Sequence, residues 1–476
     1  MPGLSFPVLR FTVADQERFA RLSGDFNPMH MDAVAARRTQ PGAPVVHGVH
    51  LMLWTLDTLI GAGVVRGPVA SVGAVFNKFV YLDTPAMIRV TQTSDDTVEA
   101  VVSAAGVDTT TVTIGLGPEG AAPDAAFGQA SAGTHGALPN VPELAEMAKQ
   151  SGWIDPEGGE DMFPHAAAIL GARRVGAIAL SSRLVGMLYP GLHSVFGSLE
   201  VAVVPEHDRP GLGFHVAMAN VRTRLLRMQI AGSGIAGTVI AFARREAVRQ
   251  PDISDIAALV APDAFAGATA LVTGGSRGLG ALTAKILAAG GARVIATYAM
   301  GKDDADAVVA EINGFLGRDA CSSLRYDMMA DAAAQIAGAD GVTHLYHFAS
   351  PRIYRQKAAL FDAAVFAEFT QAYLTSFQNL CAALQDKATG RLIAFYPSSV
   401  FVEHGRPRDM TEYAMIKAAG EILCEEMSQT EGQALAVSRR LPRMLTDQTA
   451  TLARVATDDA LATMLPVVKD VQGIQV

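Results

Sequence analysis

The chain has few of the residues that mark disulfide-rich, membrane-spanning or nucleic-acid-binding proteins. Among its 476 residues are only three cysteines, and 47 acidic side chains outnumber 38 basic ones. The resulting net charge of −9 argues against a nucleic-acid-binding surface. No run of about 18 apolar residues occurs, so we expect no membrane span. The N-terminus lacks a basic segment followed by an apolar stretch, so no secretory signal is predicted.

The cysteines are widely spaced and form no metal-binding or redox pattern. Cys321, Cys381 and Cys424 are therefore expected to be buried thiols in a reducing, cytoplasmic compartment, and we expect no metal site. Half of the residues are hydrophobic and 18% are charged, which is typical of a well-packed globular protein rather than a disordered one. The chain is too long for a single core, so two or three domains are expected.

The N-terminal half has an apolar pattern that occurs twice. Residues 1–118 contain a helix that Thr12 caps, an apolar helix and β-rich runs. Residues 119–140 are rich in Gly, Ala and Pro and predict a linker. Residues 141–246 repeat the helix-to-strand pattern imperfectly, with Gly176 aligned to Gly48. Coincidental alternation of apolar and small residues is the alternative interpretation.

The C-terminal half alternates apolar strands with amphipathic helices. Residues 247–266 form a predicted connector, and a third domain is predicted over 267–476. Buried strands are expected near residues 269–272, 294–297, 344–348, 392–396 and 435–438. Alternation of this kind predicts a doubly wound parallel sheet of the Rossmann type.

A first group of polar residues lies close together at the N-terminus. Asp25, Asn27 and His30 fall within six residues, and Pro28 restricts the turn between them. A carboxylate and an imidazole on one short loop can hold a water molecule between them. Hydration of an enoyl thioester needs a base for the water and an acid for the α-carbon, and dehydration uses the same pair. The alternative is that Asp25 caps a turn and His30 is a satisfied polar residue.

Gly48 begins the apolar helix that follows His47. Backbone N–H groups at a helix N-terminus stabilise developing negative charge, as on the oxygen of an enolate-like thioester. Glycine at this position lets a thioester approach the backbone closely.

Together these residues resemble the MaoC-like (R)-specific enoyl thioester hydratases and dehydratases. The resemblance implies a hotdog fold, in which a curled sheet wraps a long helix. It implies that Asp25 and His30 are the catalytic pair, that Asn27 supports them, and that Gly48 supplies the oxyanion N–H. The repeat lacks the Asp/His loop, so we expect a double hotdog whose second half is catalytically empty, completes the sheet and shapes an acyl tunnel.

A second group of residues begins with a glycine-rich loop between an apolar strand and a helix. Glycines in this position allow a tight turn and close approach of a pyrophosphate to the helix N-terminus. The expected cofactor contacts in this loop are Gly274, Ser276, Arg277, Gly278, Leu279 and Gly280. No Asp or Glu occurs over residues 297–302, and Arg277 could pair with a 2′-phosphate, so NADPH is favoured over NADH. A solvated surface role is the alternative for Arg277.

Further along the chain, Tyr413 and Lys417 are one helical turn apart and Ser399 follows a predicted strand. A nearby ammonium is expected to lower the pKa of the tyrosine, which could then exchange a proton with a carbonyl oxygen. Ser399 would hydrogen-bond the same oxygen, and Ser398 is the less favoured choice.

This second group resembles the short-chain dehydrogenases/reductases of the 3-oxoacyl reductase type. The resemblance implies that Asp327 contacts the adenine and Thr446 the carboxamide of the cofactor. The sequence departs from the usual pattern at 347–350, where His-Phe-Ala-Ser replaces Asn-Asn-Ala-Gly. It also has Tyr373 in place of asparagine and Arg443 in place of glycine. Some of these changes are similar to ketoreductase domains of polyketide-like assembly lines.

The sequence therefore predicts a bifunctional enzyme of fatty acid or polyketide metabolism. A 3-oxoacyl thioester would be reduced with NADPH, and the 3-hydroxyacyl product interconverted with the 2-enoyl thioester. The thioester carrier would be coenzyme A or an acyl-carrier protein, and a homodimer is expected, with no nucleic acid or membrane as partner. Two alternatives stay open: a hydratase with an impaired or differently specialised reductase domain, and a non-catalytic acyl-chain or acyl-carrier binding scaffold.

Overall fold

The computed structural model describes residues 6–121, 127–128, 141–156, 158, 161–206, 209–245, 247–403, 408–450 and 455–475. The chain divides into two compact units, and the boundary falls between residues 246 and 247. The predicted linker lies outside the described residues, apart from 119–121 and 127–128.

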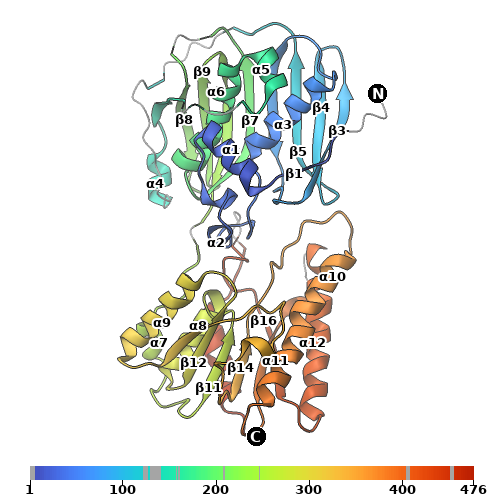
Figure 1. Cartoon of the computed structure of the whole chain (residues 1–476). Coiled ribbons are helices and arrows are strands. Elements are labelled where there is room, and N and C mark those ends of the chain that lie inside the picture. Colours follow the sequence, from blue (N-terminus) through green and yellow to red (C-terminus); the bar gives the residue numbers. More distant parts are fainter. Residues whose placement is uncertain are drawn as a thin grey trace. The chain divides into compact units, whose positions relative to one another are not determined.

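The first unit is built on one antiparallel sheet of ten strands (Figure 1). From edge to edge these are β1 (Leu9–Arg10), β3 (Pro85–Thr93), β4 (Thr97–Ala104), β5 (Val107–Leu116), β2 (Val69–Phe76), β7 (Ser194–Val203), β10 (Ile235–Ala243), β9 (Leu225–Gly232), β8 (Leu212–Asn220) and β6 (Ser151–Ile154). The order 1-3-4-5-2 of the first five strands recurs in mirror order as 7-10-9-8-6. Strands β2 and β7 join the two halves, with Ser71 opposite Ala202 and Val75 opposite Ser198.

Helices cover one face of this sheet. They are α1 (Val13–Ser23), α3 (Gly48–Gly61), α5 (Pro164–Leu170) and α6 (Ala172–Arg183), and α6 continues into a π-helix, η2 (Leu184–Leu188). Shorter pieces are η1 (Pro28–His30), α2 (Ala33–Ala36) and α4 (Val141–Glu146). Thr12 caps α1 as predicted, in a capping box with Asp15. The apolar helix α3 contributes Leu53, Leu56 and other side chains without solvent exposure to the core.

The structure corrects the predicted alignment of the two halves. Helix α3 begins at Gly48, whereas α6 begins at Ala172, so Gly176 lies in the second turn of its helix and not at its N-terminus. Small and apolar residues recur along this helix, so the sequence alone did not show which residue begins it, and the predicted start was placed at Gly176.

The second unit contains a parallel sheet, as predicted, and this sheet has six strands. These are β13 (Cys321–Arg325), β12 (Arg293–Tyr298), β11 (Thr269–Thr273), β14 (His344–His347), β15 (Ile393–Ser399) and β16 (Leu435–Leu441), in that order across the sheet. Strand β13 was not among the predicted strands. The order reverses direction between β11 and β14, which is where open α/β sheets bind ligands, beyond the carboxyl ends of the strands.

Helices pack on both faces of this parallel sheet. One apolar cluster joins α7 (Ile253–Ala257), α8 (Gly278–Ala289), α9 (Lys302–Leu316) and α13 (Ala460–Gln472) to the sheet, and a second cluster joins α11 (Ser376–Gln385) and α12 (Thr411–Gln429). Helix α10 (Ala363–Thr370) and a π-helix, η4 (Gln371–Thr375), precede α11 in the chain. The unit also contains three short 3-10 turns, η3 (Ala333–Gln335), η5 (Val400–Val402) and η6 (Arg408–Met410). The predicted connector contributes Ile253, Ile256 and Phe265 to this core.

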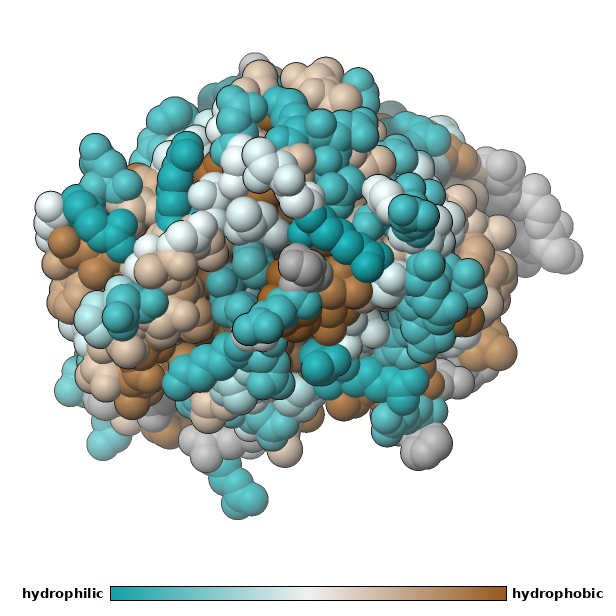
Figure 2. Space-filling model, turned by 90° about the horizontal axis from the view of Figure 1, so that it is seen from below, coloured by the Kyte–Doolittle hydropathy of each residue, from teal (hydrophilic) through white to brown (hydrophobic). Residues whose placement is uncertain are grey.

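The surface carries mixed side chains. Figure 2 shows hydrophilic residues over much of one face, with hydrophobic residues between them in separate groups. Among the described residues, no helix combines the length and the apolar character that crossing a bilayer would require.

Candidate active sites

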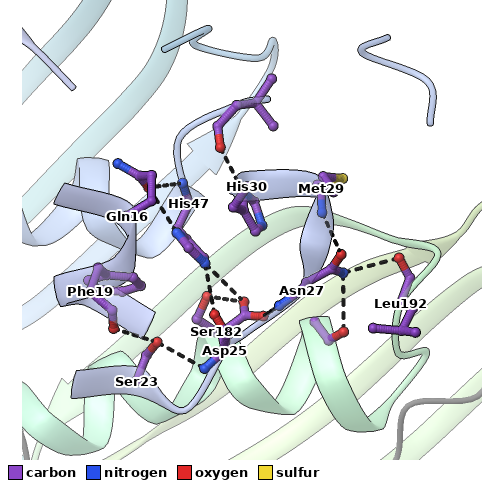
Figure 3. Close-up of polar contacts among 12 residues, drawn as sticks. Gln16, Phe19, Ser23, Asp25, Asn27, Met29, His30, His47, Ser182 and Leu192 are labelled. Carbon is purple, nitrogen blue, oxygen red and sulfur yellow. Dashed lines mark hydrogen bonds and ion pairs between the residues drawn. The ribbon is translucent and has the colours of Figure 1, made fainter. Parts of the chain in front are cut away.

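The first candidate site forms where α1 ends. Gly24 adopts the left-handed conformation with φ of 71°, which turns the chain at the end of α1. The Asn27 side chain then accepts a hydrogen bond from the Met29 N–H and caps η1. These two turns place the side chains of Asp25, Asn27 and His30 in the same buried region (Figure 3).

His30 is held as a neutral imidazole with one nitrogen free to accept. Its Nδ1 lies 2.7 Å from the Val45 carbonyl oxygen. Because a carbonyl oxygen only accepts hydrogen bonds, Nδ1 carries the proton and Nε2 remains an acceptor. Burial lowers the pKa of His30 to about 4, although the bond to Val45 opposes this shift. The imidazole is therefore uncharged at neutral pH.

The pKa of Asp25 is shifted in the opposite direction, upward. Burial raises the pKa of its carboxyl to about 6, while hydrogen bonds from Ser182 and from the Asn27 N–H lower it. The Ser182 hydroxyl donates to Oδ2 over 2.7 Å, and the Asn27 N–H donates to Oδ1 over 3.2 Å. At neutral pH the carboxylate is mostly ionised, yet it can take up a proton at little cost.

His47 is a member of this site that the sequence analysis gave no role of its own. Its Nε2 lies 3.1 Å from the Asp25 carbonyl oxygen and 3.8 Å from the Asp25 carboxylate, and its Nδ1 lies 2.8 Å from Gln16 Oε1. Its ring stacks on His30 with centroids 3.7 Å apart. Burial, then the nearby His30 and His50, hold the pKa of His47 well below its usual range. The sequence feature that could have identified His47 was its position directly before Gly48.

Donor atoms of Asp25, His30 and His47 lie within 4.8 Å of one another, so they are close enough to hold a metal ion. His30 Nδ1 and His47 Nε2 each contact a backbone carbonyl oxygen, and these contacts fix the orientation of both rings.

A cavity of about 270 Å³ opens onto Asp25, His30 and Gly48. Gly48 is the first residue of α3, and within the described part of the chain its N–H has no recorded acceptor. A β-carbon at Gly48 would lie 3.1 Å from the Phe76 ring, a tight contact that would require the ring to shift by a few tenths of an ångström. Apolar residues from both halves complete the walls, among them Leu51, Phe76, Val185, Phe196 and Phe242.

The second half of the sheet domain contributes directly to this site. Ser182 of α6 contacts the Asp25 carboxylate, and the Asn27 amide donates to the Gly186 and Leu192 carbonyl oxygens over 3.2 and 3.1 Å. The predicted role of this half, to complete the sheet and shape a tunnel, therefore omitted its contact with the predicted catalytic carboxylate. No local signal identifies Ser182, because its partner lies 157 residues away in the sequence.

The second candidate site surrounds the glycine-rich loop between β11 and α8. Gly274 has φ of 65°, and a β-carbon there would lie 3.0 Å from the backbone of Phe348 and Ala349. A β-carbon at Gly280 would lie 2.2 Å from the Gly274 carbonyl oxygen. Helix α8 begins at Gly278 without a side-chain cap, so its first N–H groups are available to an anion, as predicted for a pyrophosphate.

The structure gives Arg277 a partner that was not predicted. Its Nη1 lies 3.1 Å from the Asp447 carboxylate, whose other oxygen accepts the Val248 N–H. Arg277 is 28% exposed and Asp447 11%, so the pair is partly buried. A 2′-phosphate would have to share this guanidinium with Asp447.

The other predicted cofactor residues occupy the loops around this site. Ser276 is buried in the glycine-rich loop, and Leu279 is in the first turn of α8. Thr446 lies after β16, with its methyl group 3.9 Å from a β-carbon built at Gly278. Asp327 follows β13, is exposed, and accepts a hydrogen bond from the Met329 N–H, so it also stabilises a turn.

Ser399, Tyr413 and Lys417 come together at the carboxyl end of β15. A hydrogen bond links Ser399 and Tyr413 and lowers the tyrosine pKa, but burial dominates and raises it, with Tyr354 adding to the rise. The expectation that Lys417 lowers the pKa of Tyr413 is wrong for this structure, because burial outweighs any such effect. Ser398 instead donates its hydroxyl to Glu421.

Lys417 lies among three aromatic rings. Its Nζ donates to the Pro397 carbonyl oxygen over 2.8 Å and lies 4.0, 4.6 and 5.6 Å from the ring centroids of Tyr373, Tyr396 and Tyr413. Burial lowers the pKa of Lys417 to about 7. Tyr373, which replaces the expected asparagine, bonds the Ser350 hydroxyl over 2.5 Å, and His347 Nδ1 lies 3.3 Å from Thr273 Oγ1.

Comparison with protein families finds one match within each unit. Residues 5–113 match the model of the MaoC like domain, and residues 268–445 match that of the short chain dehydrogenase. No significant match was found among curated protein sequences.

Three solved structures that are similar to part of the chain illustrate the matches. A short chain dehydrogenase/reductase family protein is 27% identical over 34% of this chain and 68% of its own, with a TM-score of 0.31. A gluconate 5-dehydrogenase from Burkholderia cenocepacia J2315, in complex with NADP and tartrate, is 22% identical over 39% and 76%, with a TM-score of 0.35. A dehydrogenase/reductase from Sinorhizobium meliloti 1021 is 23% identical over 46% and 89%, with a TM-score of 0.36. From the family matches, the chain carries a MaoC-like domain at its N-terminal end and a short-chain dehydrogenase domain at its C-terminal end.

Proposed function

We propose that the protein is a bifunctional acyl-thioester enzyme. Its first unit, a double hotdog, interconverts (R)-3-hydroxyacyl and 2-enoyl thioesters. Its second unit reduces 3-oxoacyl to 3-hydroxyacyl thioesters with NADPH. The observation that carries the hydratase proposal is the buried pair of Asp25, with a raised pKa, and neutral His30 on one cavity wall. The carrier is coenzyme A or an acyl-carrier protein, and the protein acts in the cytoplasm as a homodimer.

In hydration, Asp25 acts first as base and then as acid. His30 Nε2 accepts one hydrogen of a water molecule and orients it, while the Asp25 carboxylate removes its other proton. The hydroxide adds to the β-carbon, and the protonated Asp25 then delivers its proton to the α-carbon. A carboxyl pKa of about 6 suits both steps, because neither protonation state is far from accessible at neutral pH. Dehydration follows the same steps in reverse.

The thioester oxygen gains negative charge between these two steps. The Gly48 N–H at the start of α3 would donate to it, and the positive end of the helix dipole would add to the stabilisation. Losing one such donor typically costs about 10²–10³-fold in rate.

For the reductase, the glycine-rich loop has the shape that a dinucleotide requires. Side chains at Gly274 or Gly280 would collide with backbone, and the N-terminus of α8 can receive a pyrophosphate. The bound NADPH would supply the hydride that reduces the 3-oxo group. Tyr413 would give the carbonyl oxygen its proton and Ser399 would hydrogen-bond that oxygen, with Asp327 and Thr446 holding the adenine and carboxamide ends.

A second candidate, a hydratase with a specialised or impaired reductase, is favoured by one observation. Lys417 lies closer to the rings of Tyr373 and Tyr396 than to that of Tyr413, and the pKa of Tyr413 is raised by burial. Fluorescence titration with NADPH and NADH, followed by turnover of an acetoacetyl thioester, separates the two candidates. Binding without turnover would support impairment.

The hydratase assignment is tested with Asp25→Asn. Because the amide cannot exchange the proton, hydration of a 2-enoyl thioester should fall about 10²–10⁴-fold. Asp32→Asn, at the exposed cap of α2, is the matched control and should leave the rate unchanged. An Asp25→Asn enzyme with the wild-type rate would place the chemistry elsewhere.

A further inference from the structure

The Asp25 carboxylate is enclosed by a segment that the catalytic motif does not contain. Ser182, in the last turn of α6, is 3% exposed and donates its hydroxyl to Oδ2 over 2.7 Å. Four residues later, Gly186 lies in the π-helix η2, and a β-carbon there would be 2.3 Å from Oδ1 and 2.5 Å from Oδ2. One face of the carboxylate therefore packs directly on the α-carbon of Gly186.

Ser182 and Gly186 are four residues apart, so they lie on the same side of their helix. Gly186 falls in the π-turn, and such turns occur frequently at functional sites. The Gly186 carbonyl oxygen and the Leu192 carbonyl oxygen, in the loop after the turn, both accept a hydrogen bond from the Asn27 amide. The second half thus fixes Asn27 and Asp25 together.

We propose that Ser182 is a positioning residue that orients the Asp25 carboxylate for proton transfer, and that Gly186 makes room for it. The second half of the sheet domain would then be part of the catalytic site, even though it lacks an Asp/His motif of its own. This inference rests on the proposed hydratase function and adds to it a residue role from outside the motif.

The hydroxyl also affects the titration of Asp25. The titratable groups that face Asp25 in the described structure are His30 and His47, both neutral at pH 7, so the protonation of Asp25 is governed by burial and by its two donors. Burial raises the pKa of Asp25 and the Ser182 hydroxyl opposes that rise. Without the hydroxyl, the carboxyl should therefore hold its proton to a higher pH.

The test compares Ser182→Ala with Ser181→Ala in the full chain. Ser181 is buried in the same helix, but its hydroxyl donates to the Ile178 carbonyl oxygen, so it controls for the loss of a buried hydroxyl. With crotonyl-CoA as probe, Ser182→Ala should lower kcat at least tenfold and move the acidic limb of the pH profile to higher pH. Ser182→Thr should recover most of the rate, and Ser181→Ala should change neither quantity.

A second pair of variants tests the packing of Gly186. Gly186→Ala should abolish hydration, because its methyl group would displace the carboxylate. Gly176→Ala, in the same helix with no atom within 4 Å of the added carbon, should keep the wild-type rate. Thermal unfolding of each variant shows whether the sheet domain is intact.

The titration of Asp25, followed by NMR of carboxyl-labelled protein, separates the two possible failures. If the wild type hydrates no enoyl thioester, the proposed function fails, while a higher Asp25 pKa in Ser182→Ala would still support the positioning contact. If the wild type is active and Ser182→Ala has the same rate and the same acidic limb, the inference is overturned. A uniform loss of kcat without a shifted limb, not recovered by Ser182→Thr, would also overturn it.

Discussion

At the scale of single residues, Asp25 has a titration that sets the pH range of the proposed hydration. The carboxylate must be ionised to remove a proton from water, and burial raises its pKa to about 6. We therefore expect kcat/KM for hydration to be low below pH 5, to rise through about pH 6, and to level off above pH 7. His30, with a pKa of about 4, should add no inflection in this range. A pH–rate profile of the wild type checks this, and activity that falls on passing upward through pH 6 would identify the protonated carboxyl as the reacting form.

The same residue should also weaken the fold at neutral pH. The pKa of Asp25 is raised from 3.8 to about 6 in the folded protein, so its contribution to stability is fully present below pH 3.8 and is lost as the pH rises through 6. This difference between the unfolded and folded pKa values lowers the free energy of unfolding by roughly 2–3 kcal/mol at pH 7. Asp25→Asn has no charge to bury, so its sheet domain should unfold at a higher temperature than the wild type at pH 7. At pH 4 the difference should largely disappear; calorimetry at both pH values measures it, and an equal or lower unfolding temperature at pH 7 would contradict the argument.

At the scale of elements, a buried ion pair attaches the loop after β14 to the helix that carries Tyr413. Lys357 contacts Glu412, the residue before Tyr413, with side chains only 4% and 1% exposed. The other Glu412 oxygen accepts the Asp362 N–H over 2.5 Å, and Lys357 also donates to the Leu360 carbonyl oxygen. The loop segment 357–362 and the start of α12 are thus held in one arrangement beside the tyrosine.

Removal of one partner should release this loop. Glu412→Gln leaves the Lys357 ammonium buried without a carboxylate, and such a loss typically destabilises a protein by about 3–5 kcal/mol. Replacing both residues, as in Lys357→Met with Glu412→Leu, should recover much of that stability, because no charge is left uncompensated. The control is Lys302→Met, which removes an exposed partner of Asp306 and should change stability by less than about 1 kcal/mol. Denaturant unfolding of the set compares their free energies of unfolding, and a Glu412→Gln variant as stable as the wild type would show that the pair does not hold the loop.

Elements whose pattern lies in consecutive residues could be predicted, and those that depend on distant contacts could not. Strands such as β11 and β15 are continuous apolar runs, so their burial between two helical layers was readable from the sequence. Strand β13 has only five residues, two of them serine, and β3 ends in exposed polar residues, so neither stood out. The π-helix after α6 has no sequence signature, and Ser182 meets Asp25 only in the folded sheet domain, where the second half packs against the first. The Asp25, Asn27 and His30 cluster was predictable because six consecutive residues contain it, whereas its partners in the second half were not.

At the scale of the whole molecule, the proposed function gives the two units complementary chemistry in one chain. A 3-hydroxyacyl thioester would be the product of the reductase and the substrate of the dehydratase, so fusion keeps the two activities in equal amounts. Each unit has its own sheet and its own apolar cores. The contacts of Asp25 cross from one half of the first unit to the other, and its partners within the described residues, Asn27, His47 and Ser182, all lie before residue 246.

This organisation predicts which cuts in the chain preserve activity. A fragment of residues 1–246 contains both halves of the ten-stranded sheet, so it should hydrate enoyl thioesters within a few-fold of the full-length rate and need no NADPH. A fragment of residues 1–118 keeps Asp25, His30 and Gly48 but lacks Ser182, Gly186 and the β7 partner of strand β2, which leaves a long sheet edge unpaired. We expect this shorter fragment to aggregate or to be inactive unless a second hotdog replaces the missing half. Expressing both fragments and measuring hydration with size-exclusion chromatography tests this, and an active monomer of residues 1–118 would show that the second half is dispensable for the chemistry.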